Sequence, residues 1–122
     1  MAQWQVLVVD DELHIRHILR LNLEAAGIGV AEAATGAEAL AQVSVACPDL
    51  IILDLGLPDM SGLAVCEALQ QKPASCRIPV IVLTALGDED THCPGMVEMI
   101  TKPFSARDVL SLIGTVLGGE AA

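Results

Sequence analysis

Short runs of apolar residues alternate along the chain with longer stretches in which apolar residues recur every three or four positions. The runs lack polar alternation, which predicts strands that are buried on both faces of a sheet. Glu32 interrupts one run and predicts that its strand lies near a sheet edge. The expected strands are Gln5–Val9, Ile28–Ala33, Leu50–Leu53, Ile78–Leu83 and Val97–Thr101.

The longer stretches predict amphipathic helices, because their apolar residues repeat with a period of about 3.6 residues. The first helix is expected from Leu13 to Gly27, and the third over about Leu63 to Gln71. Hydroxyl side chains that can cap an N-terminus precede the last three helices. These caps are Thr35, in a capping box with Glu38, then Ser61, and then Ser105.

Strands that alternate with helices across short loops predict a parallel sheet with right-handed crossovers. We expect a doubly wound α/β fold with helices on both faces of the sheet, and a single domain over residues 1–122. The connection 85–96 is too short for this pattern. A helix needs about 11 residues to return along a strand of about 17 Å, and Pro94 and Gly95 would stop it early. We therefore expect a shortened helix or a mobile loop there.

The composition excludes several classes of function. The chain has 122 residues and a formal net charge of −10, which argues against direct binding to nucleic acid, because that binding depends on Lys and Arg. No apolar run approaches the ~20 residues of a membrane span, and the N-terminus does not resemble a signal peptide. We expect a soluble cytoplasmic protein that contacts no membrane. The four cysteines have no metal-site spacing and are expected to be free thiols: Cys47, Cys66, Cys76 and Cys93.

Polar residues follow four of the predicted strands, at the point where each strand ends. The stretch from Leu50 to Gly62 delivers Asp54 to such an end, followed by a loop with Gly56 and Pro58. The carboxyl ends of parallel strands meet at one edge of a sheet, where ligands bind. The residues expected to meet there are Asp10, Asp11, Asp54, Thr84 and Lys102, with Glu12 close by.

Three carboxylates held within about 4 Å of one another would repel by roughly 4 kcal/mol per pair at an effective dielectric constant of 20. Either one of them retains a proton, with a raised pKa, or a hard divalent cation lies among them. Mg²⁺ suits this set, because it accepts few protein carboxylates and keeps water and phosphate oxygens as its other ligands. Lys102 adds a fixed positive charge.

A carboxylate beside a metal ion and a lysine can attack a phosphoryl group and form an acyl phosphate. Asp54 would be this nucleophile, Lys102 would neutralise charge on the phosphoryl oxygens, and Thr84 would donate a hydrogen bond to one of them. No general base is required. Other polar residues have structural interpretations: exposed positions for His14 and His17, loop positions for His92 and Cys93, and packing for Met96 and Met99.

Four segments of the chain resemble the response-regulator receiver domain of two-component signalling, in the same order and at close to the same spacing. They are VLVVDDE, ILDLGLPDMSG, VIVLTA and TKPFS. The resemblance covers essentially the whole chain. It implies a flavodoxin-like fold, with five parallel strands in the order 2-1-3-4-5 and five helices.

The resemblance implies that Asp54 accepts a phosphoryl group from a sensor histidine kinase, a phosphotransfer protein or a small phosphodonor. It implies that Asp10, Asp11, Asp54 and the backbone carbonyl of Gly56 hold Mg²⁺. Thr84 and Lys102 would contact the phosphoryl group. Such a protein is a switch rather than a classical enzyme, and it catalyses only its own phosphorylation and dephosphorylation.

Two features depart from the family pattern. Met99 stands where receivers have an aromatic residue, and the connection 85–96 is about four residues short. The resemblance implies that the fourth helix, the fifth strand and the fifth helix form the surface that transmits the signal, and both departures fall on it. Whether the chain forms a homodimer through that surface therefore stays open. The presence of an output domain or a partner protein is open as well. The alternatives are a receiver-like module that binds a partner without phosphorylation, and a hydrolase with an aspartyl intermediate.

Overall fold

The computed structural model describes residues 3–85 and 92–118 of the chain. Within them, five strands form one parallel sheet with the order β2-β1-β3-β4-β5. The strand order and the edge position of β2 are those predicted. The strands are β1 (Gln5–Val9), β2 (Gly29–Ala33), β3 (Leu50–Asp54), β4 (Val80–Thr84) and β5 (Met96–Thr101).

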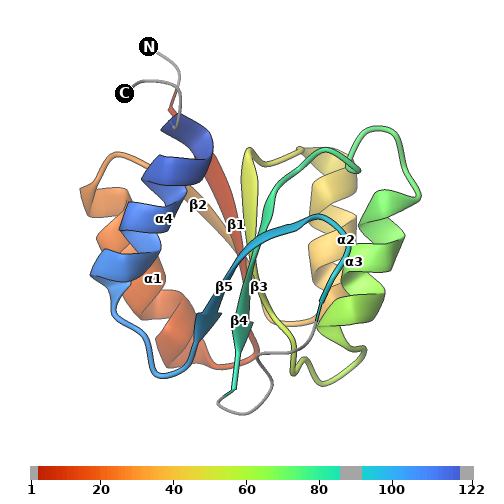
Figure 1. The fold of residues 1–122 in the computed structure, drawn as a ribbon, viewed down its shortest axis with the longest axis horizontal. Coiled ribbons are helices and arrows are strands. Elements are labelled where there is room, and N and C mark those ends of the chain that lie inside the picture. The colour runs from red at the N-terminus through yellow and green to blue at the C-terminus, as the bar shows by residue number, and fades with distance from the viewer. Residues whose placement is uncertain (1–2, 86–91, 119–122) are drawn as a thin grey trace.

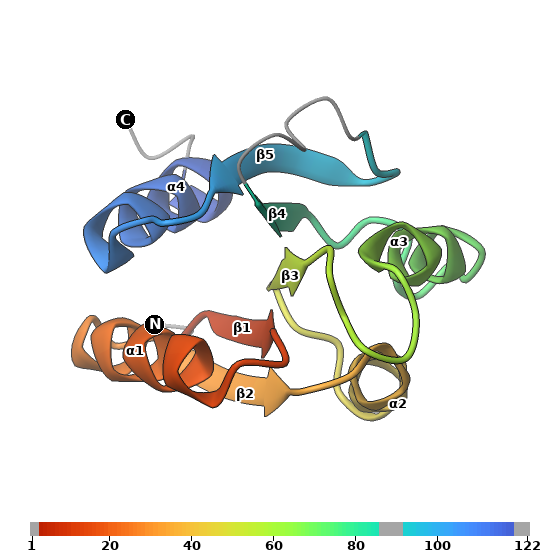
Figure 2. The same ribbon diagram turned by 90° about the horizontal axis from the view of Figure 1, so that it is seen from below.

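In the part of the chain that the structure describes, four helices cover the two faces of the sheet. They are α1 (Leu13–Ala25), α2 (Gly36–Val45), α3 (Gly62–Gln70) and α4 (Ala106–Gly118). Helices α1 and α4 lie side by side on one face, and α2 and α3 lie on the other (Figures 1 and 2). The predicted caps are present, because Thr35 and Ser61 accept hydrogen bonds from the third residue beyond each of them.

Alternate residues of the central strands contribute to two separate cores, as the period of two in a strand requires. Val6 and Val8 of β1 pack with α1 and α4, whereas Leu7 and Val9 pack with α2 and α3. Every residue of β3 and β4 is buried. This burial on both faces explains the unbroken apolar runs, and it fixes the ends of the strands that carry the polar residues.

Two predicted strand boundaries were wrong because local turns bind the terminal residues. The backbone N–H of Ile28 donates to the carbonyl of Leu23, so Ile28 belongs to the turn that follows α1, where Gly27 adopts a φ of 85°. Similarly, the N–H of Ile78 donates to the carbonyl of Ser75. Apolar runs alone do not distinguish a strand from the turn that precedes it.

The described residues of the connection between β4 and β5 are not helical: Ala85 and His92–Gly95. The prediction of a shortened helix or a mobile loop falls mainly on residues 86–91, which lie outside the described residues.

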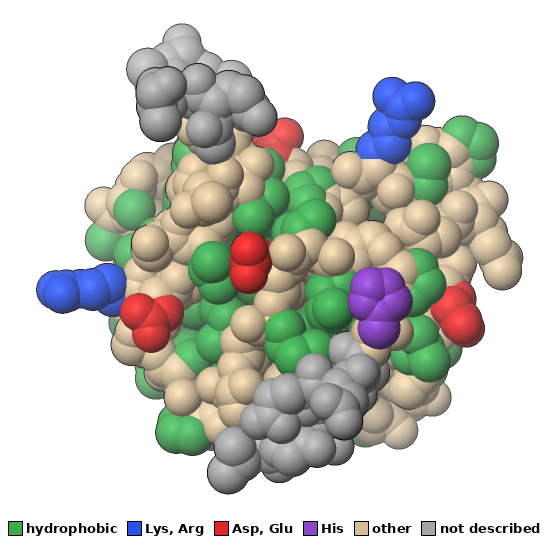
Figure 3. Space-filling model, viewed as in Figure 1, with side chains coloured by type: hydrophobic (Ala, Val, Ile, Leu, Met, Phe, Trp, Pro, Cys, Tyr) green, Lys and Arg blue, Asp and Glu red, His purple; other side chains and the backbone are tan. Residues whose placement is uncertain are grey.

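Cys93 is a loop residue, as predicted, but it is also fully buried against the core that contains α3. Hydrophobic side chains around the neighbouring strand β5 lie on the surface in Figure 3, and Val97 is among the exposed ones.

All four cysteines are free thiols. Cys66 and Cys93 are buried together in the core between the sheet and α3, and burial raises the pKa of Cys66 to about 12.

Among the described helices, none is both long and apolar enough to cross a bilayer.

Candidate functional site

The acidic residues meet because β1 and β3 are parallel neighbours in register. Val9 pairs with Leu53, so the next residue of each strand, Asp10 and Asp54, reaches the same edge of the sheet. Asp11 follows directly in the chain. One carboxylate oxygen from each of the three aspartates lies within 4.8 Å of the others. Asp10 is fully buried, Asp54 is 7% exposed and Asp11 is exposed.

Lys102 enters this cluster from the end of β5, where its backbone N–H donates to the carbonyl of Thr84 at 2.7 Å. Its Nζ lies 3.1 Å from Oδ2 of Asp10, 3.5 Å from Oδ1 of Asp54 and 3.7 Å from Oε1 of Glu12. A single ammonium group therefore faces carboxylates from three positions of the chain. We name Asp10, Asp11, Asp54 and Lys102 the acidic pocket.

Thr84 is buried at the end of β4, beside the acidic pocket. The register places Leu83 opposite Asp54, so Thr84 is one residue beyond that pair. Its hydroxyl donates to the carbonyl of Ala85 at 3.4 Å. The structure thus brings every polar strand end predicted from the sequence to one edge of the sheet, and Glu12 lies beside them as expected.

Burial is the main cause that raises the pKa of Asp54 above its ordinary value, and the charge of Asp10 adds to it. The backbone N–H of Gly56, which donates to Asp54 at 3.2 Å, and the charge of Lys102 oppose this rise. For Lys102, burial acts to lower the pKa, but the close ion pair with Asp10 and the charges of Asp54 and Glu12 raise it overall. The lysine is therefore cationic at neutral pH.

The residues of the acidic pocket fit a hard divalent cation. Among the described residues, Oδ2 of Asp10 is the buried side-chain oxygen that accepts no hydrogen bond, although the Lys102 ammonium lies near it. Three carboxylates that converge on one position are the donors that Mg²⁺ takes in proteins, together with water and phosphate oxygens. A cation among them would relieve the excess negative charge that one ammonium leaves.

Four hydrogen bonds in and around the loops that carry the acidic pocket were not predicted. The side chain of Asp10 accepts a hydrogen bond from the N–H of Glu12 at 2.9 Å, and its backbone carbonyl accepts one from Nη1 of Arg16 at 2.7 Å. In the loop that follows β3, Asp59 accepts hydrogen bonds from the N–H groups of Gly36 and Ala37, at 2.8 and 2.9 Å. Only the first had a local signal, since Asp commonly bonds to the N–H two residues on.

The remaining polar candidates lie as predicted. His14 and His17 are exposed on α1, and His14 lies 3.7 Å from Glu12. Met96 and Met99 are half-buried and pack against the core between the sheet and α3. Met99 therefore has a packing role, at the position where the family pattern has an aromatic residue.

The fold and the acidic pocket define a receiver domain. The family model of the response regulator receiver domain matches residues 6–114, and the chain belongs to this family. It is therefore a receiver domain of the two-component response-regulator class.

Two curated relatives illustrate the similarity. The chain is 37% identical over 117 residues to the phosphate regulon transcriptional regulatory protein PhoB of Rhizobium meliloti, covering 93% of this chain and 52% of that protein. It is 40% identical over 117 residues to the transcriptional regulatory protein ResD of Bacillus subtilis, covering 93% of this chain and 48% of that protein. The chain thus spans about half the length of these relatives.

Solved structures have the same fold. The chemotaxis response regulator CheY4 of Vibrio cholerae superimposes with a TM-score of 0.87 at 30% identity, covering 94% of this chain and 99% of that one. The signal receiver domain of a signal transduction histidine kinase from Syntrophus aciditrophicus superimposes with a TM-score of 0.85 at 32% identity. The match covers 95% of this chain and 91% of that one. Receiver domains thus occur in both regulators and kinases among the proteins that this chain resembles.

Proposed function

We propose that residues 1–122 act as a single receiver domain in which Asp54 is the phosphoacceptor. The donor would be a sensor histidine kinase, a phosphotransfer protein or a small phosphodonor. The observation that carries the proposal is the placement of a buried Asp54 carboxylate 3.5 Å from the Lys102 ammonium, within a cluster of further carboxylates. Such a site presents one nucleophile and a fixed positive charge to an incoming phosphoryl group.

In the proposed reaction, a carboxylate oxygen of Asp54 attacks phosphorus, and the bond from phosphorus to the leaving group breaks. Lys102 would contact a phosphoryl oxygen and neutralise part of its charge, and the raised pKa of Lys102 keeps it charged for this task. Thr84 would donate its hydroxyl hydrogen bond to a phosphoryl oxygen in place of the Ala85 carbonyl. The attacking group is a carboxylate, so the proposed step needs no general base to activate it.

We propose that Asp10, Asp11, Asp54 and the backbone carbonyl of Gly56 hold Mg²⁺. When bound, the ion would supply positive charge that offsets the phosphoryl oxygens. The buried Oδ2 of Asp10, without a hydrogen bond, supports this assignment. The chain would modify only itself, which separates it from enzymes that turn over a substrate.

Phosphorylation would act as a switch by changing the charge at the end of β3, next to the ends of β4 and β5. Thr84 and Lys102 lie at those two ends and are joined by the hydrogen bond from Lys102 N–H to Thr84 carbonyl. A partner protein or an output domain would read the resulting change. The names of PhoB and ResD identify those relatives as transcriptional regulators, which makes transcription the first process to test.

Intact-mass measurement after incubation with Mg²⁺ and acetyl phosphate tests the proposal. We expect one phosphate adduct, which disappears in Asp54→Asn and when the metal is chelated. Asp49→Asn is the matched control, because Asp49 lies just before the other end of β3 and bonds to the N–H of Gln5. Its adduct should persist. No adduct on the wild-type chain under any condition would favour a module that binds its partner without phosphorylation.

A further inference from the structure

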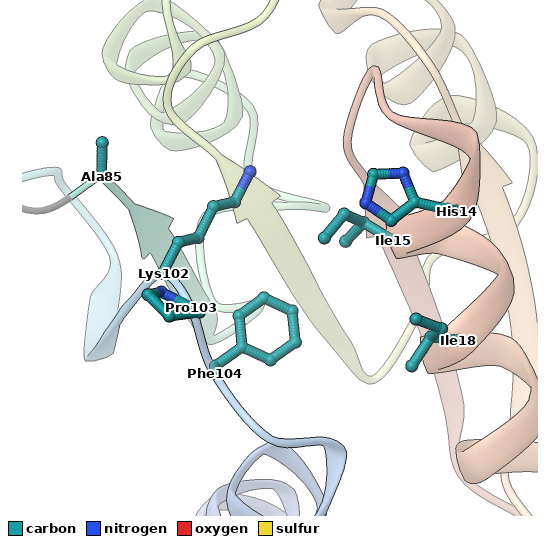
Figure 4. Close-up of a pocket in the computed structure, with 7 residues that line it drawn as sticks. All are labelled: His14, Ile15, Ile18, Ala85, Lys102, Pro103 and Phe104. Atoms are coloured by element: carbon teal, nitrogen blue, oxygen red, sulfur yellow. The ribbon is translucent and has the colours of Figure 1, made fainter.

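A cavity of about 430 Å³ opens beside the acidic pocket, between α1 and the segment that follows β5. Its walls are apolar: Ile15 and Ile18 of α1 face Pro103 and Phe104 across it (Figure 4). This volume lies within the range of ~300–1,000 Å³ that is usual for small-molecule sites. The proposed phosphoryl transfer makes no use of these apolar walls.

The cavity and the acidic pocket share Lys102. The lysine lines the cavity, and its amine lies 3.5 Å from Asp54 and 3.1 Å from Asp10. In Figure 4 the side chain of Lys102 extends away from Phe104 toward the end of β3, which carries Asp54. A molecule with its phosphoryl group at Asp54 would therefore have the rest of its structure next to the cavity.

The chemistry of the transfer restricts what that remainder can be. When Asp54 forms its bond to phosphorus, the bond from phosphorus to the bridging oxygen breaks, and that oxygen leaves with the electron pair. An acyl phosphate releases a carboxylate, which at neutral pH needs no proton because carboxylic acids have a pKa near 4. The two bonds at the bridging oxygen of an acyl phosphate form an angle, so the acyl group can point away from the line of attack and toward the cavity.

The apolar walls select the acyl group. Ile15, Ile18 and Phe104 would bury an aromatic or branched alkyl group, and a methyl group would leave most of the cavity unfilled. We infer that this cavity is a leaving-group site for acyl phosphates with an aromatic or branched apolar acyl group. The inference rests on the proposed function, because it requires Asp54 to be the phosphoacceptor.

The test compares benzoyl phosphate with acetyl phosphate as donors to the full chain, with Mg²⁺ present, and follows the rate of the phosphate adduct by intact mass. The quantity measured is the ratio of the two second-order rates. This ratio is compared between variants, so the intrinsic reactivities of the two donors cancel. We expect Ile18→Ser to lower the ratio roughly fourfold, the factor that corresponds to burial of about one methylene group.

Leu21→Ser is the matched control. Leu21 is an exposed apolar residue on the same helix, like Ile18, but it does not line the cavity. Its ratio should equal that of the wild-type chain. Equal ratios in all three proteins, or an equal fall in both variants, would overturn the inference and leave Asp54 as the phosphoacceptor. No adduct from either donor would overturn the proposed function, and the inference with it.

A second readout does not depend on phosphoryl transfer. Benzylphosphonate carries an anionic group and an aromatic ring, but its phosphorus is bonded to the benzyl carbon, so Asp54 has no leaving group to displace. We expect it to shift the methyl NMR signals of Ile15 and Ile18 in the wild-type chain, and to leave that of Leu21 unchanged. Shifts spread evenly over all three residues would contradict a site in the cavity.

Discussion

Two clusters of charged side chains lie on this small fold, and they differ in how their charges are matched. On the surface of α1 and β2, Arg16 and Arg20 both bind Glu32, and Arg20 also lies 3.0 Å from Glu24. Two cations thus meet two anions, and we name this group the matched cluster. In the acidic pocket, three aspartates lie together with a single ammonium, which pairs with two of them, Asp10 and Asp54.

The two clusters shift the pKa of a carboxyl group in opposite directions. Burial acts to raise the pKa of Glu32, but its hydrogen bonds to Arg20 and Arg16 outweigh this and lower it overall. Burial also raises the pKa of Asp54, and there the neighbouring Asp10 reinforces the rise. The comparison teaches that the matched cluster supports the fold by itself. In the acidic pocket, by contrast, the carboxylates outnumber the one ammonium beside them.

The largest expected effect comes from removing the cation of the acidic pocket. Lys102→Met leaves the fully buried Asp10 without its ammonium partner. We expect a loss of roughly 3 kcal/mol in the free energy of unfolding, as when one partner of a buried ion pair is removed. Urea unfolding without metal measures it. A loss no greater than that in Lys72→Met, where the lysine is exposed, would contradict the role of Lys102 in this pocket.

The next largest effect is expected from adding Mg²⁺, which would bring positive charge to the acidic pocket. Mg²⁺ that binds only the folded chain stabilises it by about 2.7 kcal/mol at a hundredfold excess over Kd. We expect the wild-type melting temperature to rise with Mg²⁺, and to rise less in Asp11→Asn. Thermal unfolding at several Mg²⁺ concentrations measures this. Equal rises in both proteins would argue against a metal ligand at Asp11.

Removal of a carboxylate from the acidic pocket should stabilise the metal-free chain. Asp54→Asn and Asp11→Asn relieve repulsion, and we expect gains of about 1 kcal/mol, or roughly 4 °C in melting temperature. The gain should be smaller for Asp11, because it is exposed and its charge is better screened. An unchanged or lower melting temperature in both variants would contradict the crowding of these carboxylates.

The matched cluster should respond in the opposite sense and by the smallest amount. Glu32→Gln removes an anion that two arginines bind, and we expect a loss of roughly 0.5 kcal/mol, as for partly exposed ion pairs. Chemical unfolding without metal measures it. A gain in stability would remove the contrast between the two clusters.

The pH dependence of these two substitutions sharpens the contrast. Because folding lowers the pKa of Glu32, its contribution is present above the ordinary value of 4.5 and disappears as the pH falls through the lowered pKa. Because folding raises the pKa of Asp54, its ionisation costs stability as the pH rises from 3.8 through the raised pKa. Unfolding between about pH 3 and pH 7 should therefore show that rising pH increases the benefit of Asp54→Asn and the cost of Glu32→Gln.

The positions of the strand ends could be predicted, because the pairing of parallel strands leaves little freedom in where each strand ends. A buried apolar run fixes where Asp54 lies, and the neighbouring strand fixes Asp10 beside it. The matched cluster was not predicted, although Glu32 was noticed as an interruption of its strand. Its partners come from α1, and only the packing of that helix brings Arg16 and Arg20 to β2.

Contacts made by loops were the least predictable. Cys93 follows a connection that has no periodic pattern, so its burial beside α3 depends on the path of the chain rather than on its local sequence. The same holds for the cavity beside Lys102, whose two walls come from residues about 85 positions apart in the chain, such as Ile18 and Pro103. Neither local pattern nor spacing places such residues together.

The hydrogen bonds of Asp59 have a consequence for the design of chimeric receivers. The loop that carries Gly56 is attached through Asp59 to the first turn of α2, at Gly36 and Ala37. Transplanting this loop into another scaffold would therefore also require the recipient's second helix to begin with backbone N–H groups in the same positions. The smallest exchangeable unit at this end of the molecule is the loop together with the first turn of α2.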